Sequence, residues 1–149
     1  MKTAVIYYSE HHGNTKKLLD AVKSASQDEI ELFNILETLP EDLSQYDMIG
    51  YASGIYYSKF HKKLLAYAEK NTPENKEVFF IYTYGAEKDG YTKAIRQAVA
   101  TKKAKVLGEF GSFGFNTFGP FKLIGGIAKN RPNDTDLKNA VDFYNGLHS

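Results

Sequence analysis

Short, almost wholly apolar runs alternate along the chain with segments whose apolar residues recur every three or four positions. The first pattern predicts strands that are buried on both faces, and the second predicts amphipathic helices. Their alternation is typical of βαβ units that build a parallel sheet. The predicted strands are Thr3–Tyr8, Ile30–Ile35, Met48–Ala52, Glu77–Thr83 and a fifth that runs from Lys105 toward Phe113.

Helical segments follow the predicted strands. They span Asn14–Ala25, Lys59–Lys70, Tyr91–Thr101 and a last helix after Pro132, with Asn133 or Asp134 as its N-cap, and residues 40–45 can form a single turn. The second predicted strand alternates apolar and polar residues, which is typical of a sheet edge. A crossover after each strand predicts an α/β fold with an open, doubly wound, five-stranded parallel sheet. The 149 residues fit one domain, residues 1–149.

Composition and charge narrow the classes of function. The formal net charge is +1, so the chain has no strong field to attract nucleic acid. It has no cysteine, which excludes disulfides, thiolate metal sites and a Cys nucleophile. No apolar run approaches the roughly 20 residues that span a bilayer, and the N-terminus turns polar too quickly for a signal peptide. We therefore expect no stable membrane insertion and a cytoplasmic location.

The loop after the first predicted strand carries the most specific chemistry. It joins a buried strand to the start of a helix, where backbone N–H groups and a partial positive charge favour an anion. A phosphate placed there accepts several backbone hydrogen bonds at once. Ser9, Asn14 and Thr15 can add side-chain donors, and Gly13 lets the backbone approach the oxygens closely. Capping of the helix alone explains one of these residues, but not the whole run.

This loop contains neither the Gly-x-Gly-x-x-Gly of dinucleotide folds nor the Gly-x-x-x-x-Gly-Lys-Ser/Thr of P-loops. It resembles the flavodoxin pattern Ser/Thr-x-x-Thr-Gly-Asn-Thr, which Ser9, Gly13, Asn14 and Thr15 match. The resemblance implies a sheet of order 2-1-3-4-5 and an FMN whose phosphate these residues bind. It also implies electron transfer between redox partner proteins, a reductase as donor and an unknown acceptor. His12 stands where the family usually carries Thr, and it either donates a ring N–H to the phosphate or is solvated.

The loop after the third predicted strand, residues 53–58, lies at a carboxyl end, where ligands bind in such sheets. Gly54 can take either sign of φ. The resemblance implies that a peptide here contacts flavin N5 and changes orientation when N5 gains a proton. Tyr56 or Tyr57 could stack on one face of the flavin, and we expect at least one of them to pack on the following helix. The candidate cofactor contacts are Ser53, Gly54, Ile55 and Tyr56.

The loop after the fourth predicted strand resembles the second flavin-holding loop of the family. Thr83, Tyr84 and Gly85 match best by position, and Tyr84 could cover the other face of the flavin. Tyr91 is expected to be the first core residue of the next helix.

A stretch rich in Gly and Phe, Phe113–Arg131, follows the fifth predicted strand. It carries three cations and no acid. Two interpretations stand. The stretch is a long loop packed over the sheet edge, or it is an exposed apolar patch with a basic rim that makes a peripheral contact with a partner or a membrane surface.

Alternatives to an electron carrier remain open. The segment Gly50–Lys70 also resembles part of the menaquinone-dependent protoporphyrinogen oxidases, which share the fold, so a flavin oxidoreductase of that kind or a quinone-reducing one is the second hypothesis. A response-regulator receiver needs an acidic pair after the first strand and an Asp at the end of the third. Tyr8-Ser9 and Ala52-Ser53 occupy those places and disfavour it. The sequence favours an electron carrier over a stand-alone enzyme.

The charge around the expected flavin leads to a first prediction. Reduction places negative charge near flavin N1, which nearby carboxylates oppose. Glu10, Glu87 and Asp89 are the only acids in these loops, and Lys59 and Lys88 lie beside them in the sequence. We expect the potential of the fully reduced couple to be less negative than that of a strongly acidic flavodoxin. Potentiometric titration measures it, and an equally low potential would contradict the prediction.

Overall fold

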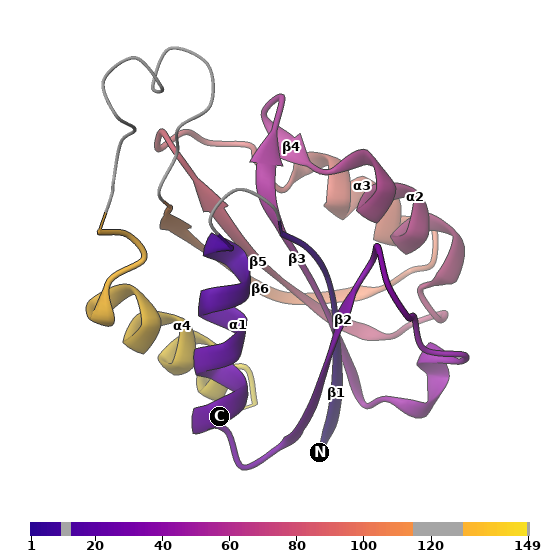
Figure 1. Cartoon of the computed structure of the whole chain (residues 1–149). Coiled ribbons are helices and arrows are strands. Elements are labelled where there is room, and N and C mark those ends of the chain that lie inside the picture. The colour runs from indigo at the N-terminus through magenta and orange to yellow at the C-terminus, as the bar shows by residue number, and fades with distance from the viewer. Residues whose placement is uncertain (10–12, 115–129, 149) are drawn as a thin grey trace.

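The computed structural model describes residues 1–9, 13–114 and 130–148. Figure 1 shows a twisted sheet with helices on both faces. The strands are β1 (Lys2–Tyr8), β2 (Glu29–Asn34), β3 (Met48–Tyr56), β4 (Lys59–Phe60), β5 (Glu77–Tyr84) and β6 (Lys105–Phe113). The helices are α1 (Asn14–Ala25), α2 (Lys62–Asn71), α3 (Lys93–Ala100) and α4 (Asp134–Gly146), with a 3₁₀ turn η1 (Leu43–Gln45).

The sheet confirms the predicted architecture. Its order is β2-β1-β3-β5-β6, and all four pairings along this path are parallel. Leaving the short β4 aside, this is the expected order 2-1-3-4-5. β2 lies at one edge, as its alternating pattern predicts, and β6 lies at the other.

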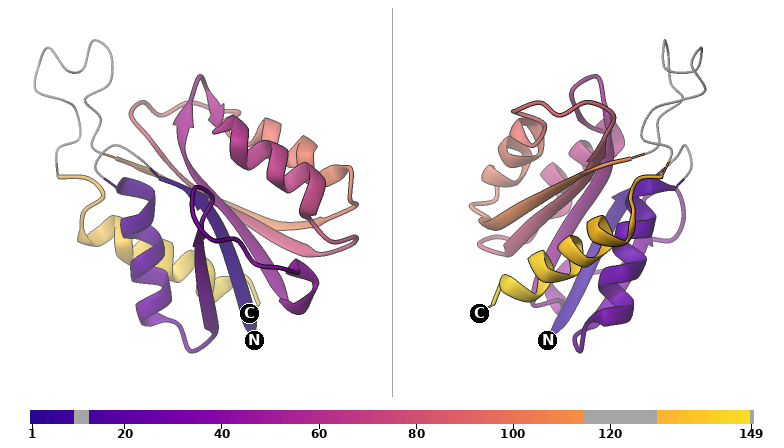
Figure 2. Two further views of the ribbon diagram at one scale, coloured as in Figure 1. Left: turned by 45° about the vertical axis from the view of Figure 1, so that its right-hand side comes forward. Right: turned by 90° about the vertical axis from the view of Figure 1, so that its left-hand side faces the viewer.

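Two helix layers enclose the sheet. Helices α1 and α4 cover one face, and α2 and α3 cover the other (Figures 1 and 2). Each face has its own apolar core, because successive residues of a buried strand point to opposite sides. In β5, Phe79 and Ile81 join the core under α1 and α4, while Phe80 joins the core under α2 and α3. All three side chains are fully buried.

The end of β3 differs from the prediction. The sequence places a loop at residues 53–58 and a helix from Lys59, but β3 continues to Tyr56 and pairs antiparallel with β4. Tyr57 and Ser58 make the two-residue turn between them, with φ of 52° and 67°. Positive φ at both positions is the pattern of a type I′ hairpin turn, which usually contains Asn-Gly. Because the sequence has no such turn signal, the hairpin could not be read from it.

The last helix begins where the sequence predicts. Asn133 is the N-cap of α4, and its side chain accepts a hydrogen bond from the N–H of Asp136 at 2.9 Å. The Asp136 carboxylate accepts one from the N–H of Asn133 in return, which completes a capping box. Arg131 also donates to Asp136, with Nη2 at 2.7 Å from Oδ1. This end of α4 is therefore held by reciprocal charged and neutral hydrogen bonds.

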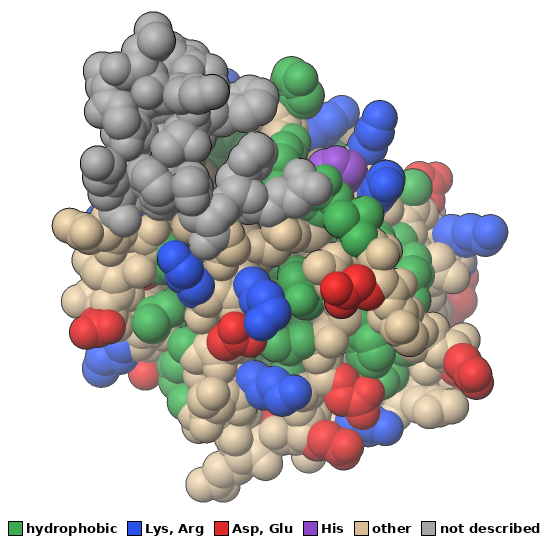
Figure 3. All heavy atoms as spheres, in the orientation of Figure 1, with side chains coloured by type: hydrophobic (Ala, Val, Ile, Leu, Met, Phe, Trp, Pro, Cys, Tyr) green, Lys and Arg blue, Asp and Glu red, His purple; other side chains and the backbone are tan. Residues whose placement is uncertain are grey.

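Acidic and basic side chains are mixed over most of the face in Figure 3. Among the residues that the structure describes, every helix is too short or too polar to cross a lipid bilayer.

A carboxylate ties β5, β6 and α3 together beneath the loop that follows β5. Glu109 accepts hydrogen bonds from the Thr92 hydroxyl at 2.8 Å and from Arg96 Nη2 at 2.7 Å. The Tyr82 hydroxyl donates to it at 3.2 Å. Burial opposes the charge on Glu109, but the hydrogen bonds from Thr92 and Arg96 hold its pKa below the ordinary value. Burial, and then the nearby Glu109, raise the pKa of Tyr82 to about 12.

Replacing Glu109 should therefore weaken the fold in a pH-dependent way. We expect Glu109→Gln to lower the free energy of unfolding by about 1 kcal/mol at neutral pH, because a partly exposed ion pair and charge-assisted hydrogen bonds are lost. A carboxyl whose folded pKa is lowered stabilises above its unfolded pKa and stops doing so as pH falls through the folded pKa. The difference between wild type and variant should therefore close in acid, as urea unfolding at neutral and acid pH would measure. Glu74→Gln, at an exposed position, is the matched control, and an equal effect of the two variants would contradict the prediction.

Candidate functional site

The strand register brings the predicted loops to one edge of the sheet. Tyr8 of β1 pairs with Ser53 of β3, and Gly54 of β3 pairs with Thr83 of β5. Thr83 in turn pairs with Ser112 of β6. The carboxyl ends of β1, β3, β5 and β6 therefore meet in one row, as the parallel topology requires.

Helix α1 begins beside this row with a left-handed residue. Its N-cap, Gly13, has φ 63° and ψ 32° and, as a glycine, contributes no side-chain cap. The first turn contains no acid. The amides of a first turn have no acceptor within their own helix and carry a partial positive charge. The start of α1 is thus electrostatically suited to an anion.

Side-chain hydroxyls and an amide surround that helix start. Asn14 and Thr15 are 9% and 1% exposed. The Thr15 and Thr83 hydroxyls form a hydrogen bond of 2.9 Å, which joins α1 to the end of β5. The Ser9 hydroxyl accepts a hydrogen bond from the N–H of Lys16 at 3.3 Å. Four of the predicted phosphate contacts, Ser9, Gly13, Asn14 and Thr15, therefore lie together.

Gly114 is a site residue that the sequence analysis missed. Its N–H donates to the carbonyl of Tyr84 at 2.9 Å. A Cβ built on it would lie 2.6 Å from Asn14 Nδ2, so its backbone packs directly on the Asn14 amide. Only glycine allows this approach. The signal in the sequence is a glycine at the end of the fifth strand, but it stands among many others in that stretch.

Ser53 and Gly54 lie at the start of the second loop. The Ser53 side chain is fully buried. Its hydroxyl donates to the Gly54 carbonyl and accepts from the N–H of His61 at 3.2 Å. Ser53 thus positions the Gly54 peptide and fixes the start of α2 against β3. Ile55 packs against the core under α2 and α3.

Three aromatic rings pack against one another beside this loop. The Tyr8 and His61 rings are parallel, with centroids 3.7 Å apart and an interplanar angle of 7°. The Tyr56 ring meets both edge-on, at 5.5 Å from Tyr8 and 5.2 Å from His61. His61 is the N-cap of α2, and its Nδ1 accepts a hydrogen bond from the N–H of Lys63 at 3.1 Å. The expectation that one of the paired tyrosines packs on the following helix is met by Tyr56, whereas Tyr57 is 91% exposed.

A second aromatic group lies at the other end of the row. Tyr84 packs edge-on to Phe113, at 4.7 Å, and lies 5.9 Å from Tyr91 at an angle of 27°. Burial, and then Glu87, raise the pKa of Tyr84. Tyr91 is buried and its hydroxyl donates to the Ala86 carbonyl at 2.6 Å, so it closes this loop. Gly85, beside Tyr84, is half-buried.

Two parts of the predicted site fall outside the described residues. His12 belongs to residues 10–12, and most of the stretch Phe113–Arg131 belongs to residues 115–129. Phe113 and Arg131, at the two ends of that stretch, are described. The Arg131 guanidinium lies over the Phe113 ring at 5.1 Å from its centroid.

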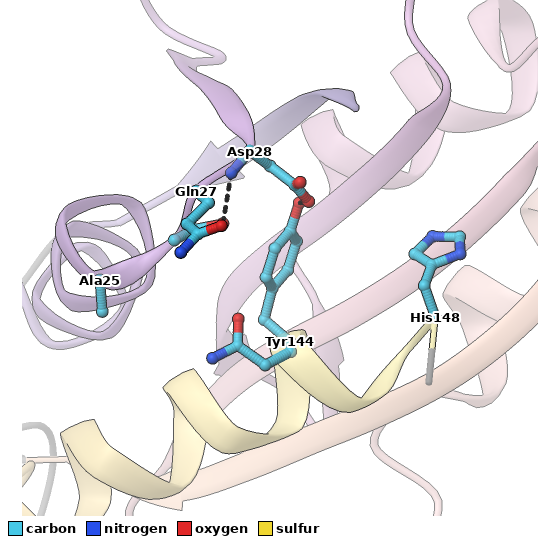
Figure 4. A pocket seen from close by; sticks show the side chains of 7 residues that line it. Ala25, Gln27, Asp28, Tyr144 and His148 are labelled. Carbon is cyan, nitrogen blue, oxygen red and sulfur yellow. Dashed lines mark hydrogen bonds between the residues drawn. The ribbon is translucent and has the colours of Figure 1, made fainter.

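A hollow of about 340 Å³ lies at the opposite end of the sheet, near the starts of β1 and β2. Figure 4 shows Asp28 and Tyr144 pointing toward each other there, with His148 nearby. The Tyr144 hydroxyl donates to Asp28 at 2.7 Å and lies 2.8 Å from the Thr3 hydroxyl. These polar groups join α4 to the amino-terminal edge of the sheet, away from the row of strand ends described above.

The left-handed start of α1 can be tested by adding one methyl group. Gly13→Ala should lower the free energy of unfolding by about 1 kcal/mol, because an L side chain disfavours this conformation. Among the described residues, no atom outside the adjoining chain lies within 4 Å of the added Cβ, so the expected cost comes from the backbone conformation. Gly146→Ala is the matched control, since that site is equally open but helical, and alanine there should raise stability by about 1 kcal/mol or less. Denaturant unfolding measures both, and an unchanged or more stable Gly13→Ala protein would contradict the geometry.

The chain is similar to known proteins in both structure and sequence. Oxidised flavodoxin 1 from Bacillus cereus superposes with a TM-score of 0.69 at 15% identity, over 99% of this chain and 97% of that one. A Fusobacterium nucleatum flavodoxin bound to flavin mononucleotide gives 0.68 at 16% identity, over 99% and 98%. A protein from Methanocaldococcus jannaschii is 37% identical over 149 residues, 99% of this chain and 98% of that protein. The flavodoxin domain profile matches residues 5–115. The chain therefore belongs to the flavodoxin domain family.

Proposed function

We propose that this chain binds one FMN at the carboxyl edge of its sheet and carries electrons between partner proteins. The observation that carries the proposal is the start of α1. There, the amides of a first turn without acid, a left-handed Gly13 and the hydrogen-bonded pair Thr15–Thr83 lie together. A dianionic phosphate monoester suits such a cluster of donors with a positive helix end.

The neighbouring residues also fit the flat part of FMN. The row of strand ends has one aromatic group at Tyr8, Tyr56 and His61 and another at Tyr84 and Phe113. Gly54 lies between them in the row and pairs with Thr83. Ser53 holds the Gly54 peptide in place through its hydrogen bonds. This peptide is therefore a backbone group that could bind the polar edge of the flavin ring. The Fusobacterium nucleatum relative, which is bound to FMN, supports the same ligand here.

When bound, FMN supplies one- and two-electron chemistry that side chains lack. The residues of this chain have simpler tasks. Ser9, Asn14 and Thr15 bind and orient the phosphate, Gly54 offers its peptide to the ring, and Tyr56 and Tyr84 limit access of water to its faces. His12, which lies outside the described residues, is proposed as a further phosphate contact because it precedes Gly13 in the sequence.

For the carrier role we propose a reductase as electron donor, a second redox protein as acceptor, and a cytoplasmic location. The mixed surface charge and the net charge of +1 support a protein that meets its partners in solution. Steady turnover of a small substrate without any partner protein would instead favour a flavin oxidoreductase.

Comparing FMN with riboflavin tests the phosphate site. Wild type should bind FMN far more tightly than riboflavin, because riboflavin has the same ring but no phosphate. Thr15→Val should weaken FMN binding about tenfold, the effect of losing one charge-assisted hydrogen bond, and should leave riboflavin binding unchanged. Quenching of flavin fluorescence during titration measures both affinities.

Thr15→Ser is the matched control, since it keeps the hydroxyl that meets Thr83. It should retain most of the FMN affinity. Equal affinity of wild type for FMN and riboflavin would contradict the phosphate site, and failure to bind either flavin would contradict the proposed function itself.

A further inference from the structure

The β3–β4 hairpin projects past the carboxyl edge of the sheet, next to the candidate flavin site (Figure 1). Its tip, Tyr57-Ser58, directly follows the segment Gly54–Tyr56. The Tyr57 side chain is 91% exposed, whereas the other exposed large apolar side chains of the described residues, Met1 and Leu36, are 51% and 48% exposed. A large ring thus stands in solvent where a partner could reach the cofactor.

The backbone under this ring is strained. Tyr57 and Ser58 both have positive φ, which costs about 1 kcal/mol or more for each residue that is not glycine. Asparagine and glycine would remove most of that cost in the same turn. Because Tyr57 is almost fully exposed, packing within the chain does not repay the strain. A contact of this ring with another molecule would offset it.

Three exposed cations follow Tyr57 closely in the sequence. Lys59 lies in β4, and Lys62 and Lys63 lie in the first turn of α2, all three exposed. The segment from Met48 to Ala68 contains no acid, and in the described part of the chain no salt bridge involves these three lysines. Figure 3 shows blue side chains gathered over the region of β4 and the start of α2. We call Tyr57, Lys59, Lys62 and Lys63 the hairpin rim.

Two of these charges also work against their own helix. Lys62 and Lys63 occupy the first turn of α2, which contains no acid. A helix N-terminus carries partial positive charge, so cations there cost a few tenths of a kcal/mol each. Neither local pairing nor the helix explains this cluster, whereas an acidic surface laid against it would.

We propose that the hairpin rim docks an electron-transfer protein with an acidic face, with the Tyr57 ring as the apolar contact and Lys59, Lys62 and Lys63 as the charged ones. This rests on the proposed flavin site, because the hairpin that carries the rim starts at the Gly54 peptide. Three clustered lysines steer an acidic partner toward that edge over roughly a Debye length, which is about 10 Å at an ionic strength of about 0.1 M. An aromatic anchor inside a charged border is a common composition of a binding hot spot.

Calorimetric titration of the full chain with a strongly acidic [2Fe–2S] ferredoxin tests the docking surface without relying on flavin activity. We expect a salt-sensitive complex, and Lys59→Gln/Lys62→Gln/Lys63→Gln should weaken it about tenfold. The matched control, Lys23→Gln/Lys70→Gln/Lys103→Gln, removes the same charge at exposed positions near the carboxyl ends of α1, α2 and α3. It should change the affinity less than twofold.

Tyr57→Asn gives a second, independent readout. The variant should be more stable to denaturant, because asparagine tolerates the left-handed turn, and yet bind the ferredoxin about tenfold more weakly. Stability and docking should therefore move in opposite directions. A purely structural role for Tyr57 would move them together or not at all.

Several results would overturn the proposal. The first is that the acidic ferredoxin does not bind. The second is that both triple-lysine variants lose the same amount of ferredoxin affinity. The third is that anionic vesicles or RNA bind to the rim more tightly than the ferredoxin does. A Tyr57→Asn protein that loses FMN affinity but keeps docking would assign the ring to the cofactor and also overturn it. Rim-dependent docking by a chain that takes up no FMN would refute the proposed function and leave the docking surface standing.

Discussion

The hydrogen bond between Thr15 and Thr83 joins the two halves of the candidate site. Thr83 is the penultimate residue of the central strand β5, and Thr15 lies in the first turn of the helix that follows the first strand. The bond forms only because β1 and β5 flank β3 in parallel register, which brings their carboxyl ends to the same edge. Sheet order, helix start and the loops of the candidate site therefore depend on one another.

Much of this could be predicted from the sequence. Apolar runs such as Glu77–Thr83 identify buried strands because both faces of a central parallel strand meet helices. Asn133 and Pro132 locate the last helix by capping chemistry alone. The run Ser9, Gly13, Asn14 and Thr15 predicts a phosphate site, and the structure brings these four residues together at the start of α1. Local patterns were enough wherever the interactions were local.

The rest depends on contacts between distant segments. The β3–β4 hairpin uses Tyr57 and Ser58 where turn chemistry prefers Asn-Gly, so no local signal announces it. The stacking of His61 on Tyr8 joins residues more than fifty positions apart. The approach of Gly114 to Asn14 spans a hundred positions. Such pairings follow from the register of the sheet, which a single sequence does not reveal in atomic detail.

The central claim is that the amides opening α1 grip the phosphate of FMN. The most direct measurement is the change in backbone amide NMR shifts when FMN, or riboflavin as its phosphate-free counterpart, is added to the protein. The amides of Gly13 through Lys16 should shift strongly with FMN and hardly at all with riboflavin, while those near Gly54 respond to both. Unchanged Gly13–Lys16 amides in the FMN complex would contradict the account.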